Sequence, residues 1–147
     1  MPSKKIIQYA LNACKKSSCI HTLAAVLYRG GSVLRICPNE IKTIQYRKKY
    51  FPHGQPSKHA EINCIHNIPR DVIMKCSMLV VRIDKKGELK SAKPCYACVN
   101  ALYDAGIKKV YYSSYTGEIL KLDFNELIQG KYTKESFKIY DQRTRKI

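Results

Sequence analysis

Two short stretches of the chain carry residues that could bind a metal or transfer protons. In the first, Cys95 and Cys98 stand three residues apart, directly after Pro94 and ahead of an apolar-periodic segment. The dipole at a helix start favours thiolate over thiol, and two thiolates make half of a tetrahedral zinc site. The second stretch offers a ligand-type imidazole at His59, followed two residues later by the carboxylate of Glu61. We interpret the two stretches as parts of one metal site.

An open zinc site is the arrangement that these residues favour. His59, Cys95 and Cys98 would be three ligands, and a water in the fourth position is typical of a catalytic zinc. Zinc lowers the pKa of such a water. Glu61 can take the water proton and deliver it first to a ring nitrogen and then to a leaving amine. The chemistry is hydrolysis at an amidine-like ring carbon, of which cytosine C4 and adenine C6 are the biological examples.

Each half of the pattern also allows other interpretations. Pro-Cys-x-x-Cys alone is typical of a redox pair or of half a structural zinc site. A fourth ligand from His53 or His66 would close the site, although we expect His53 in a loop and His66 on a helix surface. Four further cysteines are expected to be buried small apolar residues, namely Cys14, Cys19, Cys37 and Cys76.

The hydrophobic pattern predicts the elements that must position these residues. Helices are expected at 3–16, about 58–66 and 94–105, with strands at 23–28, 33–36, 77–83, 110–112 and 119–122. Hairpin turns are expected at 29–32 and 113–118, and Gly106 is expected to end the third helix. A short helix is expected at 124–129, whereas 40–58 is a long irregular stretch.

This order of elements predicts a three-layer α/β/α sandwich with a mixed sheet of about five strands. We expect a single domain over residues 1–147, with a core at about 3–122 and a basic C-terminal tail. In an open sheet of this kind the two motif helices can point their N-termini at one spot, where a ligand usually binds.

Composition and charge bear on partners and compartment. Lysine and arginine number 27 against 11 acidic residues, giving a net charge of +16, which suits a polyanion partner such as single-stranded nucleic acid. Lysine outnumbers arginine 20 to 7, however, which an AT-rich genome, for example a viral one, can produce alone. Seven cysteines without a secretory leader predict reduced thiols in the cytoplasm. No apolar run approaches the ~20 residues of a membrane span, so no membrane association is expected.

The two motifs and their separation resemble the cytidine and deoxycytidylate deaminase family, whose signature is His-x-Glu followed by Pro-Cys-x-x-Cys. The resemblance covers about residues 3–122, including 25–27 before a glycine turn and 106–112 after the cysteine helix. It implies the family's fold and one zinc ion per chain, held by His59, Cys95 and Cys98. Glu61 would be the general acid/base. A small departure is Cys64, which stands where the family usually has an apolar residue and is expected to face the core.

Substrate contacts follow from the resemblance by position alone. The backbone of Ala60 would touch the polar edge of the base, and Asn39 would lie near the sugar. Pro94 is expected beside the substrate as well.

Three functions are consistent with this resemblance. The first is a hydrolytic deaminase that converts a cytosine-type base to uracil in a free pyrimidine nucleoside or nucleotide, within a homo-oligomer. The second is a polynucleotide deaminase acting on single-stranded DNA, RNA or tRNA, with basic loops around Lys48 and Lys90 as contacts. The third is an inactive zinc-bearing binding module, against which the intact Glu61 argues.

The segment after Val110 bears on the choice of substrate. A hairpin there gives an antiparallel last strand, as in the free-cytidine and several toxin-type members of the family, whereas deoxycytidylate, tRNA and polynucleotide deaminases have a helix and a parallel strand. Residues 113–118 predict the hairpin. Tyr96-Ala97 and Val99-Asn100 differ from the glycine and Arg-Gln that the free-nucleoside group usually carries. The chain fits no subgroup fully, and we favour a small pyrimidine nucleotide as substrate.

Overall fold

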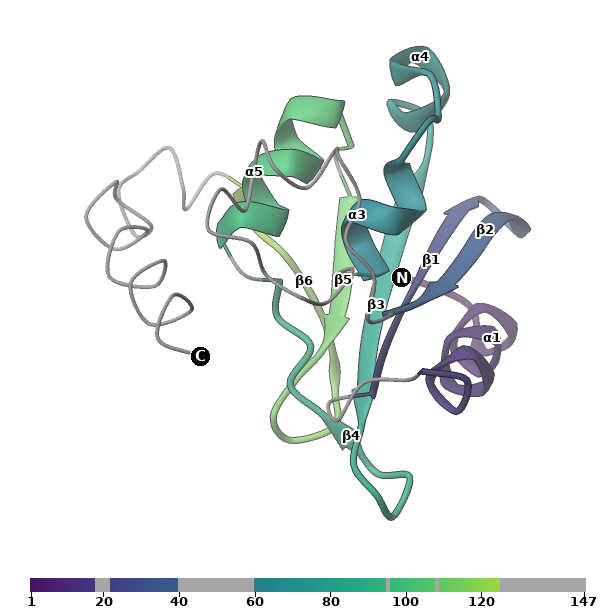
Figure 1. Cartoon of the computed structure of the whole chain (residues 1–147), viewed down its shortest axis with the longest axis vertical. Coiled ribbons are helices and arrows are strands. Elements are labelled where there is room, and N and C mark those ends of the chain that lie inside the picture. The colour runs from purple at the N-terminus through teal and green to yellow at the C-terminus, as the bar shows by residue number, and fades with distance from the viewer. Residues whose placement is uncertain (18–21, 40–59, 95, 108, 125–147) are drawn as a thin grey trace.

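The computed structural model describes residues 1–17, 22–39, 60–94, 96–107 and 109–124 (Figure 1). Among these residues, no helix is long and apolar enough to cross a membrane. The elements in chain order are α1 (Lys4–Cys14), β1 (Thr22–Arg29), β2 (Ser32–Pro38), α3 (Ala60–Ile65), α4 (Arg70–Ile73), β3 (Ser77–Ile83), β4 (Leu89–Lys90), α5 (Tyr96–Ala105), β5 (Lys109–Ser113) and β6 (Ile119–Lys121).

The strands form one mixed sheet in the order β2-β1-β3-β5-β6, and the two-residue β4 pairs with β3. β1 runs antiparallel to both β2 and β3, whereas β5 is parallel to β3. β6 is antiparallel to β5, which confirms the hairpin predicted after Val110. The expected sheet of about five strands thus has a sixth, because β4 is too short to show a period in the sequence.

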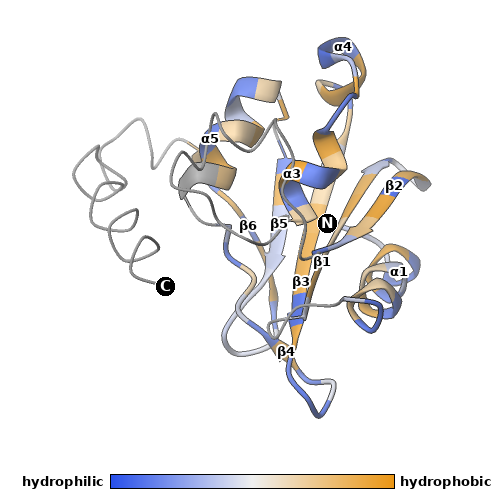
Figure 2. Ribbon diagram, viewed as in Figure 1, coloured by the Kyte–Doolittle hydropathy of each residue, from blue (hydrophilic) through white to orange (hydrophobic). Residues whose placement is uncertain are grey.

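Helices cover both faces of the sheet, as predicted for a three-layer sandwich (Figure 1). On one face α1 buries Ile6 against a cluster that includes Val26 and Leu79. On the other face α3 and α5 pack on a cluster that includes Leu27 and Val80. Consecutive residues of β1 and of β3 therefore point to opposite faces of the sheet, because side chains alternate along a strand. Figure 2 shows the apolar colouring of these central strands.

The ends of the helices follow local chemistry. The hydroxyl of Ser3 accepts a hydrogen bond from the backbone N–H of Ile6 at 3.3 Å and so caps the start of α1. Gly106 ends α5 as predicted, with a φ of 93° that a side chain would resist. A Cβ there would also lie 2.8 Å from the Cγ of Met74. The sequence pattern missed α4, a single turn after Pro69 that is too short for a periodic signal.

Several predicted features lie outside the described residues. These are the long irregular stretch 40–58, all but the first residue of the expected helix 124–129, and the basic tail. A helix was expected at 58–66, and its described part begins at Ala60. A second helix was expected from Pro94, and the structure assigns it from Tyr96.

The carboxyl ends of β2, β3 and β5 lie at the same edge of the sheet. β3 and β5 are parallel, and β2 shares their direction because both β2 and β3 are antiparallel to β1. Residues 106–108 connect the end of α5 to the start of β5, so α5 begins toward the carboxyl edge and runs back along the sheet. In Figure 1 α3 runs in the same direction as α5, so both helices begin toward that edge.

Leu102 packs α5 against the sheet, because its side chain is fully buried in the cluster shared with α3. We expect Leu102→Ala to lower the free energy of unfolding by about 2–5 kcal/mol, as large-to-small core substitutions do. Urea denaturation measures this loss. Leu120→Ala is the matched control, because Leu120 is 40% exposed, and we expect it to change the same quantity by no more than about 0.5 kcal/mol. Equal losses in the two variants would contradict the packing described for α5.

Candidate active site

The starts of α3 and α5 hold the two predicted motifs. Ala60 opens α3 directly after His59, and Tyr96 opens α5 directly after Cys95. The two helices pack against each other on the same face of the sheet (Figure 1). Ala60 and Cys98 belong to a single buried cluster. The fold therefore brings together two segments that are more than thirty residues apart in the sequence.

Glu61 and Cys98 are both withdrawn from solvent. The side chain of Glu61, in the first turn of α3, is 4% exposed, and that of Cys98 is fully buried and outside any disulfide. A buried carboxylate is costly unless charged or polar partners compensate it, and such groups concentrate at functional sites.

The donor chemistry fits zinc. Two thiols and one imidazole are donors that zinc prefers, and Cys98 is a reduced, buried thiol near the start of a helix. His59 and Cys95 lie outside the described residues. Within the part of the chain that the structure describes, no group of three or more His, Cys, Asp or Glu side chains gathers to hold a metal. The ligand set of His59, Cys95 and Cys98 therefore stays a prediction.

The two histidines that could close the site are placed differently. His66 follows the last residue of α3, six residues from Ala60, which is about 9 Å along a helix axis. It is therefore at the far end of α3 from the predicted zinc site. His53 lies outside the described residues.

Asn39 lies at the carboxyl edge of the sheet, one residue after β2. Its side-chain oxygen accepts a hydrogen bond from the backbone N–H of Leu23 at 3.0 Å, and its own N–H donates to the Leu23 carbonyl at 2.9 Å. The Ser17 hydroxyl contacts both oxygens of Asn39. Asn39 thus joins the end of β2 to β1 and to the segment after α1. Contact with a sugar stays a prediction for this residue.

The other two expected substrate contacts are also enclosed. Ala60 is fully buried at the first position of α3, and Pro94 is buried two residues ahead of α5. Both stand at the helix starts where the base was expected to bind, and their contacts with a substrate stay predictions.

Ser113 is a positioning residue that sequence reasoning missed. Its fully buried hydroxyl donates to the Lys90 carbonyl at 2.7 Å and accepts from the Arg82 N–H at 3.2 Å. Its backbone carbonyl accepts from the Ala92 N–H at 2.8 Å. These bonds hold the segment that leads into Pro94. A serine at the end of a strand looks like a turn residue in the sequence, so no local signal indicated this role.

Arg35 is a second positioning residue that the sequence pattern did not reveal. From β2 its guanidinium donates to the backbone carbonyls of Asn63 at 3.2 Å and His66 at 2.7 Å. These carbonyls belong to the C-terminal end of α3, where helical backbone acceptors lack intrahelical partners. The contact therefore fixes α3, and with it Glu61, against the edge strand.

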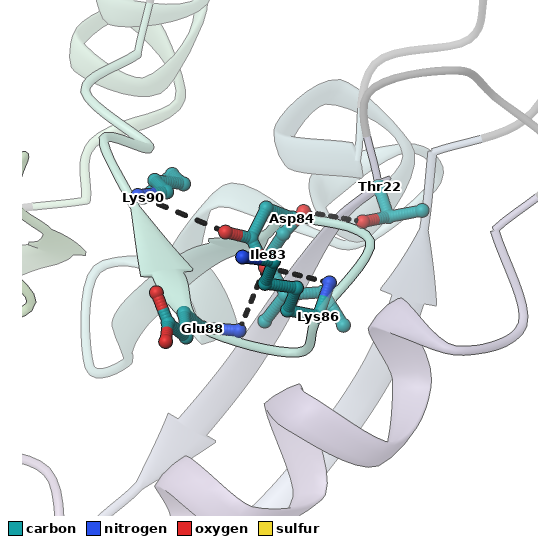
Figure 3. A network of polar contacts seen from close by, with 6 residues as sticks. All are labelled: Thr22, Ile83, Asp84, Lys86, Glu88 and Lys90. Carbon is teal, nitrogen blue, oxygen red and sulfur yellow. Dashed lines mark hydrogen bonds and ion pairs between the residues drawn. The ribbon is translucent and has the colours of Figure 1, made fainter.

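The turn between β3 and β4 is held by Asp84 (Figure 3). One carboxylate oxygen accepts from the backbone N–H groups of Glu88 and Lys86, each at 2.9 Å. These bonds hold the pKa of Asp84 below its ordinary value, and the bond from Glu88 contributes most. The other oxygen lies 3.7 Å from the Lys90 ammonium, and Thr22 donates to the Ile83 carbonyl at 2.7 Å. The start of the segment 90–94 is therefore anchored by polar bonds.

Thiols away from the site behave as buried apolar groups. Cys14, Cys37 and Cys76 are buried, which confirms the prediction for these three, whereas Cys19 lies outside the described residues. Burial raises the pKa of Cys14 to about 12 and is the main cause of the raised pKa of Cys64. Cys64 faces the core as expected and donates to the Ala25 carbonyl at 3.2 Å. Thiols held neutral in this way are poor metal ligands.

A cavity of about 740 Å³ lies at the other end of α5. Gly106 and Ile107, just past the helix, line it together with Arg70 and Phe124. Tyr103 is the first residue of α5 that lines this cavity, so about 10 Å of helix separates the cavity from Tyr96 at the start of α5. The cavity therefore takes no part in the predicted site.

Comparison with known proteins agrees with the fold and the motifs. The family described as the cytidine and deoxycytidylate deaminase zinc-binding region matches residues 2–114. The chain therefore belongs to the cytidine and deoxycytidylate deaminase family. Membership implies a zinc-dependent deaminase whose substrate is a nucleoside, a nucleotide or a nucleic acid. No curated protein matches the chain.

Removing the Ser113 hydroxyl tests how the approach to Pro94 is held. In Ser113→Ala the Lys90 carbonyl and the Arg82 N–H each lose a partner, so we expect the free energy of unfolding to fall by about 1–3 kcal/mol. We also expect faster hydrogen exchange at the Ala92 amide than the global loss explains. Ser32→Ala, at an exposed position of β2, is the control that leaves both quantities unchanged. Unaltered stability and exchange in Ser113→Ala would show that these bonds do not hold the segment.

Proposed function

We propose that this chain is a zinc-dependent hydrolase that converts a cytosine-type base to uracil in a free pyrimidine nucleoside or nucleotide. The observation that carries the proposal is the buried carboxylate of Glu61 on a helix that packs against the helix of the buried Cys98 thiol. Family membership supports the chemistry, and the helix starts at the carboxyl edge support the location. We propose that residues 1–147 act as a single domain.

The metal would be one zinc ion per chain, held by His59, Cys95 and Cys98. When bound, zinc supplies a Lewis acid that makes water nucleophilic at neutral pH. The protein contributes the buried setting of the site, since Ala60 and Cys98 are fully buried and Pro94 is also enclosed. In that setting electrostatic interactions with the reacting atoms are stronger than in water.

Glu61 would transfer the protons of the reaction. Its carboxylate takes a proton from the attacking water and delivers it to N3 of the base, which makes C4 more electrophilic. Glu61 then takes the proton of the new C4 hydroxyl and passes it to the exocyclic nitrogen, which leaves as ammonia when the C4–N bond breaks. One water is consumed and one ammonia released, so Glu61 ends in the ionised state in which it began. Its 4% exposure favours this internal transfer over exchange with solvent.

Two features support a small substrate. β6 is antiparallel to β5, the arrangement that accompanies the free-cytidine and several toxin-type members of the family. Asn39 lies at the same edge of the sheet as the starts of α3 and α5, a position suited to the sugar. We propose contacts from Ala60 and Pro94 to the base or its surroundings, and a homo-oligomer as the functional form.

A polynucleotide substrate is the second candidate. The observation that favours it is the charge ahead of the second motif: Lys85 and Lys86 are exposed in the turn between β3 and β4, and Lys93 is exposed next to Pro94. Together with the net charge of +16, these side chains would attract a phosphate backbone. The basic stretch around Lys48 lies outside the described residues.

An activity panel tests the proposal. Zinc-loaded protein is incubated with cytidine, deoxycytidine, their monophosphates, single-stranded DNA and tRNA, and the release of ammonia is measured. We expect conversion of at least one free pyrimidine substrate. Glu61→Gln keeps the size of the side chain but cannot shuttle the proton, so we expect a rate about 10²–10⁴-fold lower. Asp71→Asn, an equivalent carboxylate-to-amide change at an exposed position of α4, should leave the rate unchanged.

The outcomes separate the candidates. No conversion of any substrate by protein with stoichiometric zinc would contradict a deaminase function. Conversion confined to DNA or tRNA, with a steep dependence on salt, would replace the free nucleotide by the polynucleotide candidate. An unchanged rate in Glu61→Gln would remove Glu61 from the mechanism.

A further inference from the structure

The outward side of α1 carries two pairs of lysines with neutral polar and aromatic side chains between them. We call the exposed side chains of this helix and its C-terminal end the α1 stripe: Lys4, Lys5, Gln8, Tyr9, Asn12, Lys15 and Lys16. At about 100° per residue they lie within an arc of about 140°, and they extend over about 18 Å along the axis. Four are cations, two are amides, one is aromatic, and none is a carboxylate.

Helix stability does not account for Lys4 and Lys5, the two lysines at the start of α1. Lys4 and Lys5 stand in the first turn of α1, which has no acidic residue, so their charges oppose the positive end of the helix dipole. Among the described residues, no carboxylate forms an ion pair with a lysine of the α1 stripe. Repulsion among these cations is therefore relieved only by solvent, salt or a bound anion.

The other members of the α1 stripe suit a nucleic acid. Tyr9 is 36% exposed and lies beneath the Lys5 ammonium, 5.7 Å from the ring centre, and an exposed ring of this kind can stack on a base. The Gln8 amide donates to Asn12 at 3.0 Å, so two amides are held side by side on the surface. Amides contact phosphate, sugar and base edges alike. A lipid surface fits less well, because the apolar side of α1 is buried against the sheet.

We propose that the α1 stripe binds the phosphate backbone of single-stranded nucleic acid. It lies on the face of the sheet opposite α3 and α5, so it is separate from the candidate active site (Figure 1). Its C-terminal end adjoins Asn39, since the hydroxyl of Ser17 donates to the Asn39 carbonyl at 3.2 Å. A bound strand would therefore reach the carboxyl edge of the sheet. This binding goes beyond the proposed function, because it requires no deamination.

Binding to a labelled oligothymidylate tests the proposal, since thymine has no amino group to hydrolyse. The test variant changes Lys4, Lys5, Lys15 and Lys16 to glutamine, which keeps a good helix former at each position. We expect it to bind at least about ten-fold more weakly at 0.1 M salt. We also expect the slope of log affinity against log salt to fall in magnitude by about 2–3, which is about 0.7 for each lost phosphate contact.

The control variant removes the same charge elsewhere, by changing Arg29, Lys75, Lys109 and Lys121, all exposed, to glutamine. We expect it to keep most of the affinity and slope, and circular dichroism should show both variants folded. Equal losses in the two variants would show that net charge alone binds the strand. The proposal would also be overturned by an absence of binding to oligothymidylate, or by binding to anionic phospholipid vesicles instead. Deamination of a free nucleoside, measured in parallel, reports separately on the proposed function.

Discussion

The parallel pairing of β3 and β5 decides toward which edge of the sheet α5 begins. Because both strands end at one edge, the helices that accompany them must run back along the sheet, and their starts converge at that edge. α3 and α5 lie on the same face and bury a common cluster. The two predicted motifs stand at these helix starts, so the strand order determines where a shared site would form.

Polar bonds from the sheet then hold the surroundings of the site. Ser113 binds the segment that approaches Pro94, and Arg35 binds the C-terminal end of the helix that carries Glu61. Asn39 ties the end of the edge strand to β1. Each bond joins segments that are distant in the sequence, and breaking one would remove a hydrogen bond from a partly buried carbonyl or amide. The site is therefore supported by the sheet as well as by the two helices.

Much of the architecture could be predicted because it follows from periodicity. The helix at 3–16, the strand at 77–83 and the hairpin after Val110 have patterns that solvent exposure imposes directly on the sequence. β4 and α4 could not be predicted, because elements of two and four residues are too short for a repeating hydrophobic pattern. For the candidate site, the motif spacing predicted the two helix starts. The roles of Ser113 and Arg35 depend on tertiary contacts that no local pattern contains.

We predict that the starts of α3 and α5 share one zinc ion. X-ray absorption at the zinc edge tests it most directly, on the purified wild-type chain and on Cys98→Ser. We expect one zinc per chain with two sulfur ligands at about 2.3 Å and nitrogen or oxygen ligands at about 2.0–2.1 Å. One sulfur should be lost, or the metal released, in Cys98→Ser, and neither should change in Cys76→Ser. A wild-type chain without stoichiometric zinc, a zinc with four sulfur ligands, or a spectrum unchanged by Cys98→Ser would contradict the account.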